Sequence, residues 1–160
     1  MGEDQSFGNE SRSGVLQPMS DAHKMAFTAL NLSTAPVWLA MVLFPRARLT
    51  AWLARRATYA LAGLGLTYVT LLGVAVVASD ERIDISDPDS LRRGLTNPTG
   101  FLAGWTHYLA FDLMVGRWIW RSNLDEGRTA RLPLVLTWWF GPAGLTLELA
   151  RRARRARRSA

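Results

Sequence analysis

The stretch GWTHYLAFDLMVGRWIW, residues 104–120, decides how this chain is interpreted. It has the length and apolar character of a membrane-spanning helix, yet it contains the ionisable residues His107, Asp112 and Arg117. A helix that crosses a bilayer needs about 20 mainly apolar residues. A charged side chain near its centre costs about 2.5–3.5 kcal/mol on insertion scales, so such residues usually face the protein interior and serve a function.

Three more apolar blocks of similar length accompany this stretch. Together they predict an all-α, polytopic membrane protein, a bundle of four transmembrane helices over residues 25–44, 57–78, 101–120 and 132–150. Each block is long enough to cross a hydrocarbon core of roughly 30 Å. Backbone N–H and C=O groups must be satisfied within the segment in lipid, which requires helices. The first two blocks contain no charged residue, so they lack the polar face of a soluble helix.

The two ends of the chain differ from the spans in composition. Residues 1–24 are polar and rich in Gly, Ser and Glu, which predicts a disordered tail. Residues 151–160 read RRARRARRSA and follow an apolar block, a pattern that favours contact with anionic lipid headgroups over nucleic acid. More Lys and Arg residues fall on the side of the two termini than on the other side, which predicts cytoplasmic termini. This excess of Lys and Arg comes only from the arginines of residues 151–160, and without them the count would favour the other side.

Composition also limits the chemistry that the chain can perform. There is no cysteine, which excludes disulfides and thiolate catalysis. The histidines His23 and His107 are too few for a histidine-rich di-iron centre or bis-histidine haem. We therefore expect no metal and no cofactor. The Arg- and Ala-rich composition is typical of a high-GC bacterium, so we expect a multi-pass protein of the bacterial cytoplasmic membrane.

The three ionisable residues of the central stretch do not share one helix face. At about 100° per residue, Asp112 lies on the stripe of Trp105 and Tyr108, and His107 points about 140° away. Asp112 lies near the middle of the span, so it must face the bundle. Arg117 lies near one end, where it could serve the site or only anchor the helix at the headgroups.

The other spans supply candidate partners for Asp112. Asn31 is a polar residue of the first span, and Trp138 and Trp139 lie deeper in the fourth span than an interfacial belt requires. Pro142, in the motif FGPAG, is expected to break the backbone hydrogen bonds of the fourth helix near mid-membrane. Glu148 lies near the end of that span, where we expect it at the interface.

The run LAGWTHYLAFDLMVGRWIWR, residues 102–121, followed by FGPAGL, resembles the neoxanthin-synthase-like (abscisic-acid-deficient) family of small integral membrane proteins. Asn31, Pro36, Trp38 and Pro45 match an earlier part of the family pattern. The resemblance extends from about residue 25 to residue 151. Ser122 departs from it, because the family commonly has an acidic residue there, and a family histidine before the last span has no counterpart.

The resemblance implies a function. Plant members are required to convert violaxanthin into neoxanthin, an isomerisation that opens an epoxide and forms an allene. This implies an isoprenoid or carotenoid ligand and acid–base catalysis without a redox cofactor. Asp112 would be the acid, because a desolvated carboxyl group retains its proton, and His107 would be the base. The substrate-binding candidates are Trp105, Tyr108, Arg117, Asn31, Trp138 and Trp139.

Two alternatives to an isomerase stay open. The chain could be a non-catalytic membrane subunit that binds pigment or a partner protein. It could instead be a small proton or ion conduit that uses Asp112 and His107. The sequence leaves the oligomeric state open, and a homo-oligomer is compatible with any of these functions.

Overall fold

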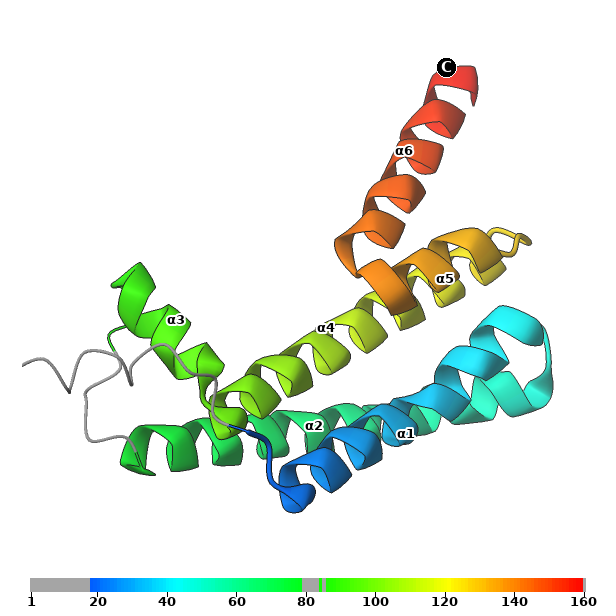
Figure 1. The fold of residues 1–160 in the computed structure, drawn as a ribbon. Helices are drawn as coiled ribbons and strands as arrows, with labels where there is room; N and C mark the ends of the chain where they lie inside the picture. Colours follow the sequence, from blue (N-terminus) through cyan, green and yellow to red (C-terminus); the bar gives the residue numbers. More distant parts are fainter. Residues whose placement is uncertain (1–17, 79–83, 85, 160) are drawn as a thin grey trace, which may run out of the picture.

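The computed structural model of the protein describes residues 18–78, 84 and 86–159, and these residues form α-helices without a β-strand (Figure 1). In chain order the helices are α1 (Asp21–Leu43), α2 (Arg48–Ala78), α3 (Pro88–Thr96), α4 (Pro98–Asp125), α5 (Arg131–Phe140) and α6 (Pro142–Ser159). The predicted all-α class is confirmed. The prediction of a disordered tail falls mostly on residues 1–17, which lie outside the described residues.

α1 and α2 form an antiparallel hairpin of two apolar helices (Figure 1). α1 begins at Asp21 rather than at residue 25, because the side chain of Ser20 caps it by accepting a hydrogen bond from the backbone N–H of His23. Each of the two helices is long and apolar enough to cross a membrane, by length and composition. Many of their large hydrophobic side chains are exposed, which supports a location in a membrane.

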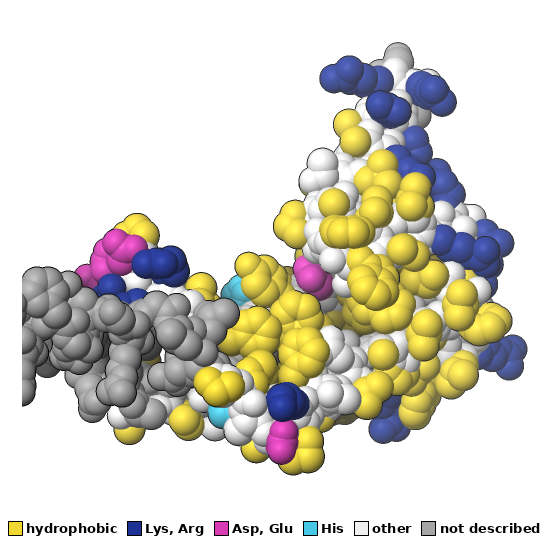
Figure 2. Space-filling model, viewed as in Figure 1, with side chains coloured by type: hydrophobic (Ala, Val, Ile, Leu, Met, Phe, Trp, Pro, Cys, Tyr) yellow, Lys and Arg dark blue, Asp and Glu magenta, His cyan; other side chains and the backbone are white. Residues whose placement is uncertain are grey.

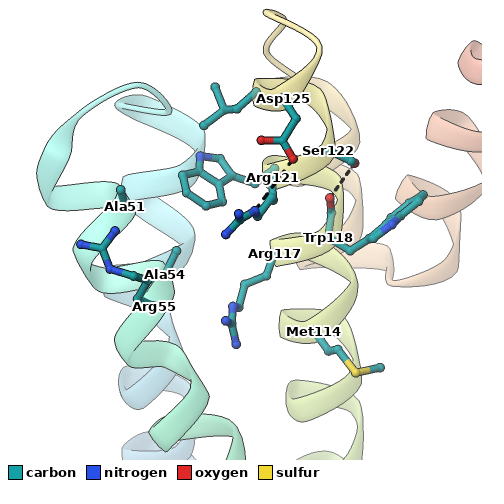
Figure 3. A pocket seen from close by; sticks show the side chains of 11 residues that line it. Ala51, Ala54, Arg55, Met114, Arg117, Trp118, Arg121, Ser122 and Asp125 are labelled. Carbon is teal, nitrogen blue, oxygen red and sulfur yellow. Dashed lines mark hydrogen bonds and ion pairs between the residues drawn. The ribbon is translucent and has the colours of Figure 1, made fainter.

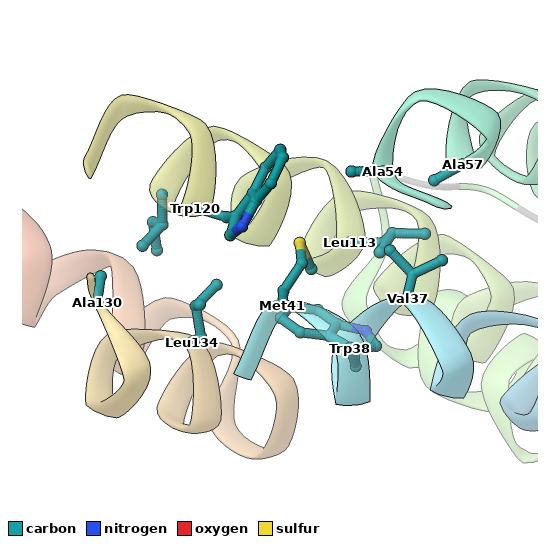
Figure 4. Close-up of a cluster of buried hydrophobic side chains, with 10 residues drawn as sticks. Val37, Trp38, Met41, Ala54, Ala57, Leu113, Trp120, Ala130 and Leu134 are labelled. Carbon is teal, nitrogen blue, oxygen red and sulfur yellow. The ribbon is translucent and has the colours of Figure 1, made fainter. Parts of the chain in front are cut away.

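α4 is the central helix of the structure and packs against both α1 and α2. The core lies where these helices meet α5 (Figure 4). Its buried members are Val37, Trp38, Met41, Ala54, Ala57, Leu113, Ile119, Trp120, Ala130 and Leu134. The indole N–H of Trp120 donates to the backbone oxygen of Pro45 at 2.9 Å, which fastens the C-terminal part of α4 to the turn between α1 and α2.

A further helix, α3, lies within the segment that the sequence suggests is only a connection. Asp87 caps it by accepting hydrogen bonds from the backbone N–H groups of Asp89 and Ser90, and Pro88 occupies the first position. α3 leads directly into α4. The two helices approach so closely that a Cβ on Gly100 would overlap the backbone oxygen of Gly94.

The segment predicted as the fourth span, residues 132–150, is not one helix. It is broken at Gly141, which separates α5 from α6 and has a φ of 44°. Only glycine adopts this conformation readily, and Pro142 cannot donate a backbone hydrogen bond to α5. The described residues therefore do not form the predicted bundle of four transmembrane helices, because the fourth helix ends halfway.

α6 turns back toward the C-terminal end of α4 instead of continuing α5 (Figure 1). Glu148 fixes this direction. It is completely buried, and its Oε1 accepts hydrogen bonds from Asn123 at 2.9 Å and from Arg152 at 2.8 Å. Glu148, which we expect at the membrane interface, is thus also buried inside the protein by its contact with Asn123 of another helix, a pair that a hydropathy pattern cannot reveal.

One end of the structure collects most of the arginines. Arg46 donates to the backbone oxygen of Gly127 at 2.8 Å, and Arg131 donates to that of Leu43 at 3.4 Å. The α1–α2 turn and the α4–α5 connection therefore lie side by side, and α6 returns to the same place. We call these parts, residues 44–48, 121–131 and 151–158, the arginine-rich end. In Figure 2 most of the visible Lys and Arg side chains lie along α6 and at the adjoining end of the bundle.

Packing of α1 on α4 leads to a first prediction. A Cβ on Gly116 would overlap the ring of Trp38, which is almost completely buried. Gly116→Ala should therefore lower the free energy of unfolding by about 1–3 kcal/mol, measured by thermal denaturation of the detergent-solubilised protein. Gly63→Ala is the matched control, because Gly63 is also helical but has open space around it. Equal stability of the two variants would contradict this packing.

Candidate functional site

A cavity of about 520 Å³ lies between α1, α4 and the junction of α5 with α6. Its walls are mainly apolar, with a small number of polar side chains, as is usual for ligand pockets. Six of the residues that the sequence suggests for the site line it together: Asn31, Trp105, Tyr108, Asp112, Trp138 and Trp139. The stripe on α4 that joins Asp112 to Trp105 and Tyr108 thus faces one cavity.

Asp112 lies against the break between α5 and α6. A Cβ built on Gly141 would lie 2.8 Å from its Oδ1 and 3.3 Å from its Oδ2, so the carboxylate packs directly on the backbone of that residue. Among the described residues it has no hydrogen-bond or ion-pair partner. The glycine leaves room for the carboxylate, which lines the cavity without a partner from the part of the chain that the structure describes.

A second polar group of the cavity also lacks a partner. The indole N–H of Trp105 is buried and makes no hydrogen bond to any described residue. The ring is fixed by aromatic neighbours, with its centroid 5.2 Å from that of Phe27 and 6.2 Å from that of Phe101. The N–H is closed off from solvent, and a buried donor without an acceptor is costly.

Aromatic side chains form the wall of the cavity that α5 contributes. Trp138 stacks on Trp38 of α1, with ring centroids 6.0 Å apart and planes inclined by 6°. The ring centroid of Trp139 lies 5.9 Å from that of Trp138. Trp139 is 71% exposed, and Tyr108 on α4 is 61% exposed. The cavity therefore has a rigid inner wall and an aromatic rim that faces outward. An apolar ligand could enter across this rim from surrounding lipid.

The structure does not bring His107 into this cavity. Its ring lies 4.5 Å from that of Phe111 and 5.5 Å from that of Tyr68 on α2, so it is directed to another side of α4. Arg117 is also elsewhere, because it donates a hydrogen bond to the hydroxyl of Thr58 on α2 at 3.1 Å. Asp112 and His107, the predicted acid and base, therefore do not meet. This agrees with their separation of about 140° around the helix axis.

The part of the chain that the structure describes contains no group of three or more Asp, Glu or His side chains that could hold a metal ion. Asp112 contributes a carboxyl group to its cavity, and Tyr108 contributes a phenol hydroxyl. The chemistry available there is proton donation or acceptance, or recognition of a polar group on an otherwise apolar ligand.

Comparison with known families identifies the chain. The model of the ABA DEFICIENT 4-like (ABA4-like) family matches residues 25–147, which include every residue that lines the cavity. The chain belongs to the ABA4-like family. This confirms the resemblance inferred from the sequence. Neither a curated protein nor a solved structure matches the chain in the two other comparisons.

Two residues that matter to this ABA4-like structure escaped sequence reasoning. Gly141 is one, although its position beside Pro142 was a signal that the chain could bend there. Glu148 is the other, and no local signal marks it, because its burial depends on Asn123. The family match ends at residue 147, so the arginines that follow lie beyond it.

The contact of Asp112 with Gly141 predicts the effect of a methyl group. Gly141→Ala should lower the free energy of unfolding by more than the roughly 1–2 kcal/mol that a left-handed alanine costs, because its Cβ would also press on the Asp112 carboxylate. Gly127→Ala is the matched control, since Gly127 has a φ of 71° and open space around it. Thermal denaturation should show the larger loss for Gly141→Ala. The opposite order would refute the contact.

Proposed function

We propose that this chain is an integral membrane protein that binds an oxygenated isoprenoid in the Asp112 cavity and isomerises it by proton transfer. Membership of the ABA4-like family supports a neoxanthin-synthase-like protein. The observation that carries the proposal is the Asp112 carboxyl group, which has no partner among the described residues and lines an aromatic cavity. An unpartnered carboxyl group inside a membrane protein is expected to be functional.

The cavity favours a long apolar ligand with a polar end group. Trp138, Trp139 and Tyr108 offer flat surfaces to a polyene or isoprenoid chain. The ring of Trp105 adds a further aromatic surface to the cavity. Asn31 donates its own amide N–H to the backbone oxygen of Phe27, which leaves its side-chain oxygen as an acceptor. These features support a carotenoid carrying an epoxide near one end.

One carboxyl group is sufficient for the proposed reaction, because an isomerisation neither gains nor loses protons overall. Protonated Asp112 donates its proton to the epoxide oxygen as a carbon–oxygen bond breaks. The carboxylate that results removes the proton of the adjacent vinylic carbon, and the electrons of that carbon–hydrogen bond form the second double bond of the allene. Asp112 returns to its initial protonated form. This route leaves His107 without a catalytic role.

The position of His107 favours one alternative. Because no imidazole joins Asp112 and the phenol of Tyr108 in the cavity, the site is also suited to binding a pigment without converting it. In that case Asp112 would recognise a hydroxyl group of the ligand. A proton or ion conduit that uses both residues is less well supported, since they lie on different sides of α4.

We propose a membrane arrangement that differs from four spans. α1, α2 and α4 would cross the bilayer, and α5 with α6 would form a hairpin that enters and leaves through one face. α5 has 10 residues, or about 15 Å, which is half of the hydrocarbon thickness. The break at Gly141 is tolerable at that depth because it is buried in protein and lines a cavity.

This arrangement also changes the proposed orientation. The α1–α2 turn, the α4–α5 connection and the C-terminal arginines would all lie on one side, and the N-terminus on the other. The positive-inside rule then assigns the arginine-rich end to the cytoplasm of a bacterial cell. The C-terminal arginines would contact anionic lipid headgroups there, as the sequence suggests. The sequence predicts that both termini are cytoplasmic. We propose instead that only the C-terminus lies in the cytoplasm.

Replacement of the Asp112 carboxyl group tests the proposed reaction. We expect the wild-type protein to convert violaxanthin in a bacterium that produces this pigment, measured by chromatography of pigment extracts. Asp112→Asn keeps the side-chain shape but cannot exchange the proton, so conversion should fall by about 10²–10⁴-fold. Asp125→Asn is the matched control on the same helix, because Asp125 is exposed and pairs only loosely with Arg121 at 3.8 Å.

The outcomes separate the two candidate functions. Unchanged conversion by Asp112→Asn would refute the catalytic role of Asp112. If the wild-type protein converts nothing but co-purifies with unaltered pigment, the binding function is correct and the isomerase is wrong. Loss of conversion in Asp125→Asn as well as in Asp112→Asn would show that the effect is not specific to the cavity.

A further inference from the structure

A second cavity, of about 670 Å³, lies between α2 and α4 at the arginine-rich end (Figure 3). Three arginines line it: Arg55 from α2, and Arg117 and Arg121 from α4. Figure 3 shows the side chains of Arg117 and Arg121 extending from α4 toward α2. The cavity is separate from the Asp112 site, and the proposed isomerisation makes no use of it.

The charges around this cavity are unbalanced. Among the described residues, Asp125 alone contributes a carboxylate to its lining, 3.8 Å from Arg121. Arg117 is half-buried, and its hydrogen-bond partner, the hydroxyl of Thr58, is neutral. No carboxylate among the described residues lies within ion-pair distance of Arg117. The guanidinium groups of Arg117 and Arg121 therefore share a single carboxylate on this side of α4, and the more buried of the two, that of Arg117, has no anionic partner among the described residues (Figure 3).

The remaining walls are apolar. Ala51 and Ala54 of α2 and Met114 and Trp118 of α4 also line the cavity, and in Figure 3 Met114 and Trp118 extend from the side of α4 next to the one that carries Arg117. The cavity therefore combines guanidinium groups with apolar walls. A guanidinium group removed from water is stabilised by an anion that accepts paired hydrogen bonds, and phosphate oxygens suit this geometry. A free phosphate ion would satisfy the arginines but would leave the apolar walls uncovered.

We propose that this cavity binds an anionic phospholipid, with the phosphate between Arg117 and Arg121 and the acyl chains along Met114 and Trp118. Basic pockets between membrane helices on the cytoplasmic side are suited to such headgroups. The inference rests on the proposed membrane location and orientation and is independent of catalysis. It explains why an arginine is tolerated within α4 one turn before Arg121. It also assigns Arg117 to lipid binding instead of substrate binding.

Lipid binding to the full-length protein in neutral detergent tests the proposal. Native mass spectrometry is used to titrate phosphatidylglycerol against phosphatidylcholine, which carries the same phosphate beside a compensating cation. We expect the first phosphatidylglycerol to bind about tenfold more tightly than phosphatidylcholine. Arg117→Gln with Arg121→Gln should abolish this preference. Arg92→Gln, which removes an exposed arginine of α3, should keep it.

The location of the bound lipid is measured separately. A phosphatidylglycerol with a photoreactive acyl chain should label the α4 peptide that contains Met114 and Trp118, and the double variant should lose this label. If the double variant no longer elutes as a folded protein, Arg121→Gln alone serves, since this side chain is exposed, and labelling should fall about threefold.

Three results would overturn the proposal. They are equal affinity for the two lipids, labelling that persists in the variants, and complete displacement of phosphatidylglycerol by excess inorganic phosphate. The last result would show that the arginines bind free phosphate instead of a lipid. No pigment enters these measurements, so their failure would leave the proposed isomerase untested and unharmed.

Discussion

The contact between Asp112 and Gly141 is the constraint on which the rest of the structure depends. A carboxylate halfway along α4 meets the point where the chain between α5 and α6 reverses direction. Only a glycine leaves room there for the carboxylate, and only a residue free to adopt positive φ allows the reversal. The same contact closes the cavity that Trp105 and Trp138 line, so the fold and the candidate site share one cause.

The reversal at Gly141 also determines where the charges lie. Because α6 returns along the C-terminal part of α4, Glu148 reaches Asn123 and Arg152 reaches Glu126 at 3.1 Å. The C-terminal arginines thus join those of the α1–α2 turn and the α4–α5 connection. A continuous helix would have carried them to the opposite end. A single backbone break therefore links the cavity at mid-depth to the cationic surface at one end.

Sequence patterns predicted the features that depend on neighbouring residues. The features that depend on contacts between helices could not be predicted in this way. The all-α class, the shared face of Asp112 and Trp105, and the separation of His107 from that face follow from apolar length and helical periodicity. The two-helix hairpin could not be predicted, because residues 132–150 satisfy an apolar span whether or not Gly141 reverses the chain. The burial of Glu148 was equally hidden, since it depends on Asn123 of another helix.

The most direct test of this account is the side of the membrane on which the C-terminus lies. The chain has no cysteine, so single cysteines can be introduced by Ala47→Cys, Thr129→Cys, Arg157→Cys and Thr96→Cys and labelled with a membrane-impermeant maleimide. We expect positions 47, 129 and 157 to react from the cytoplasmic side and position 96 from the other side. Labelling of position 157 on the side opposite to position 129 would show that α5 and α6 cross the bilayer, and would contradict the reversal at Gly141.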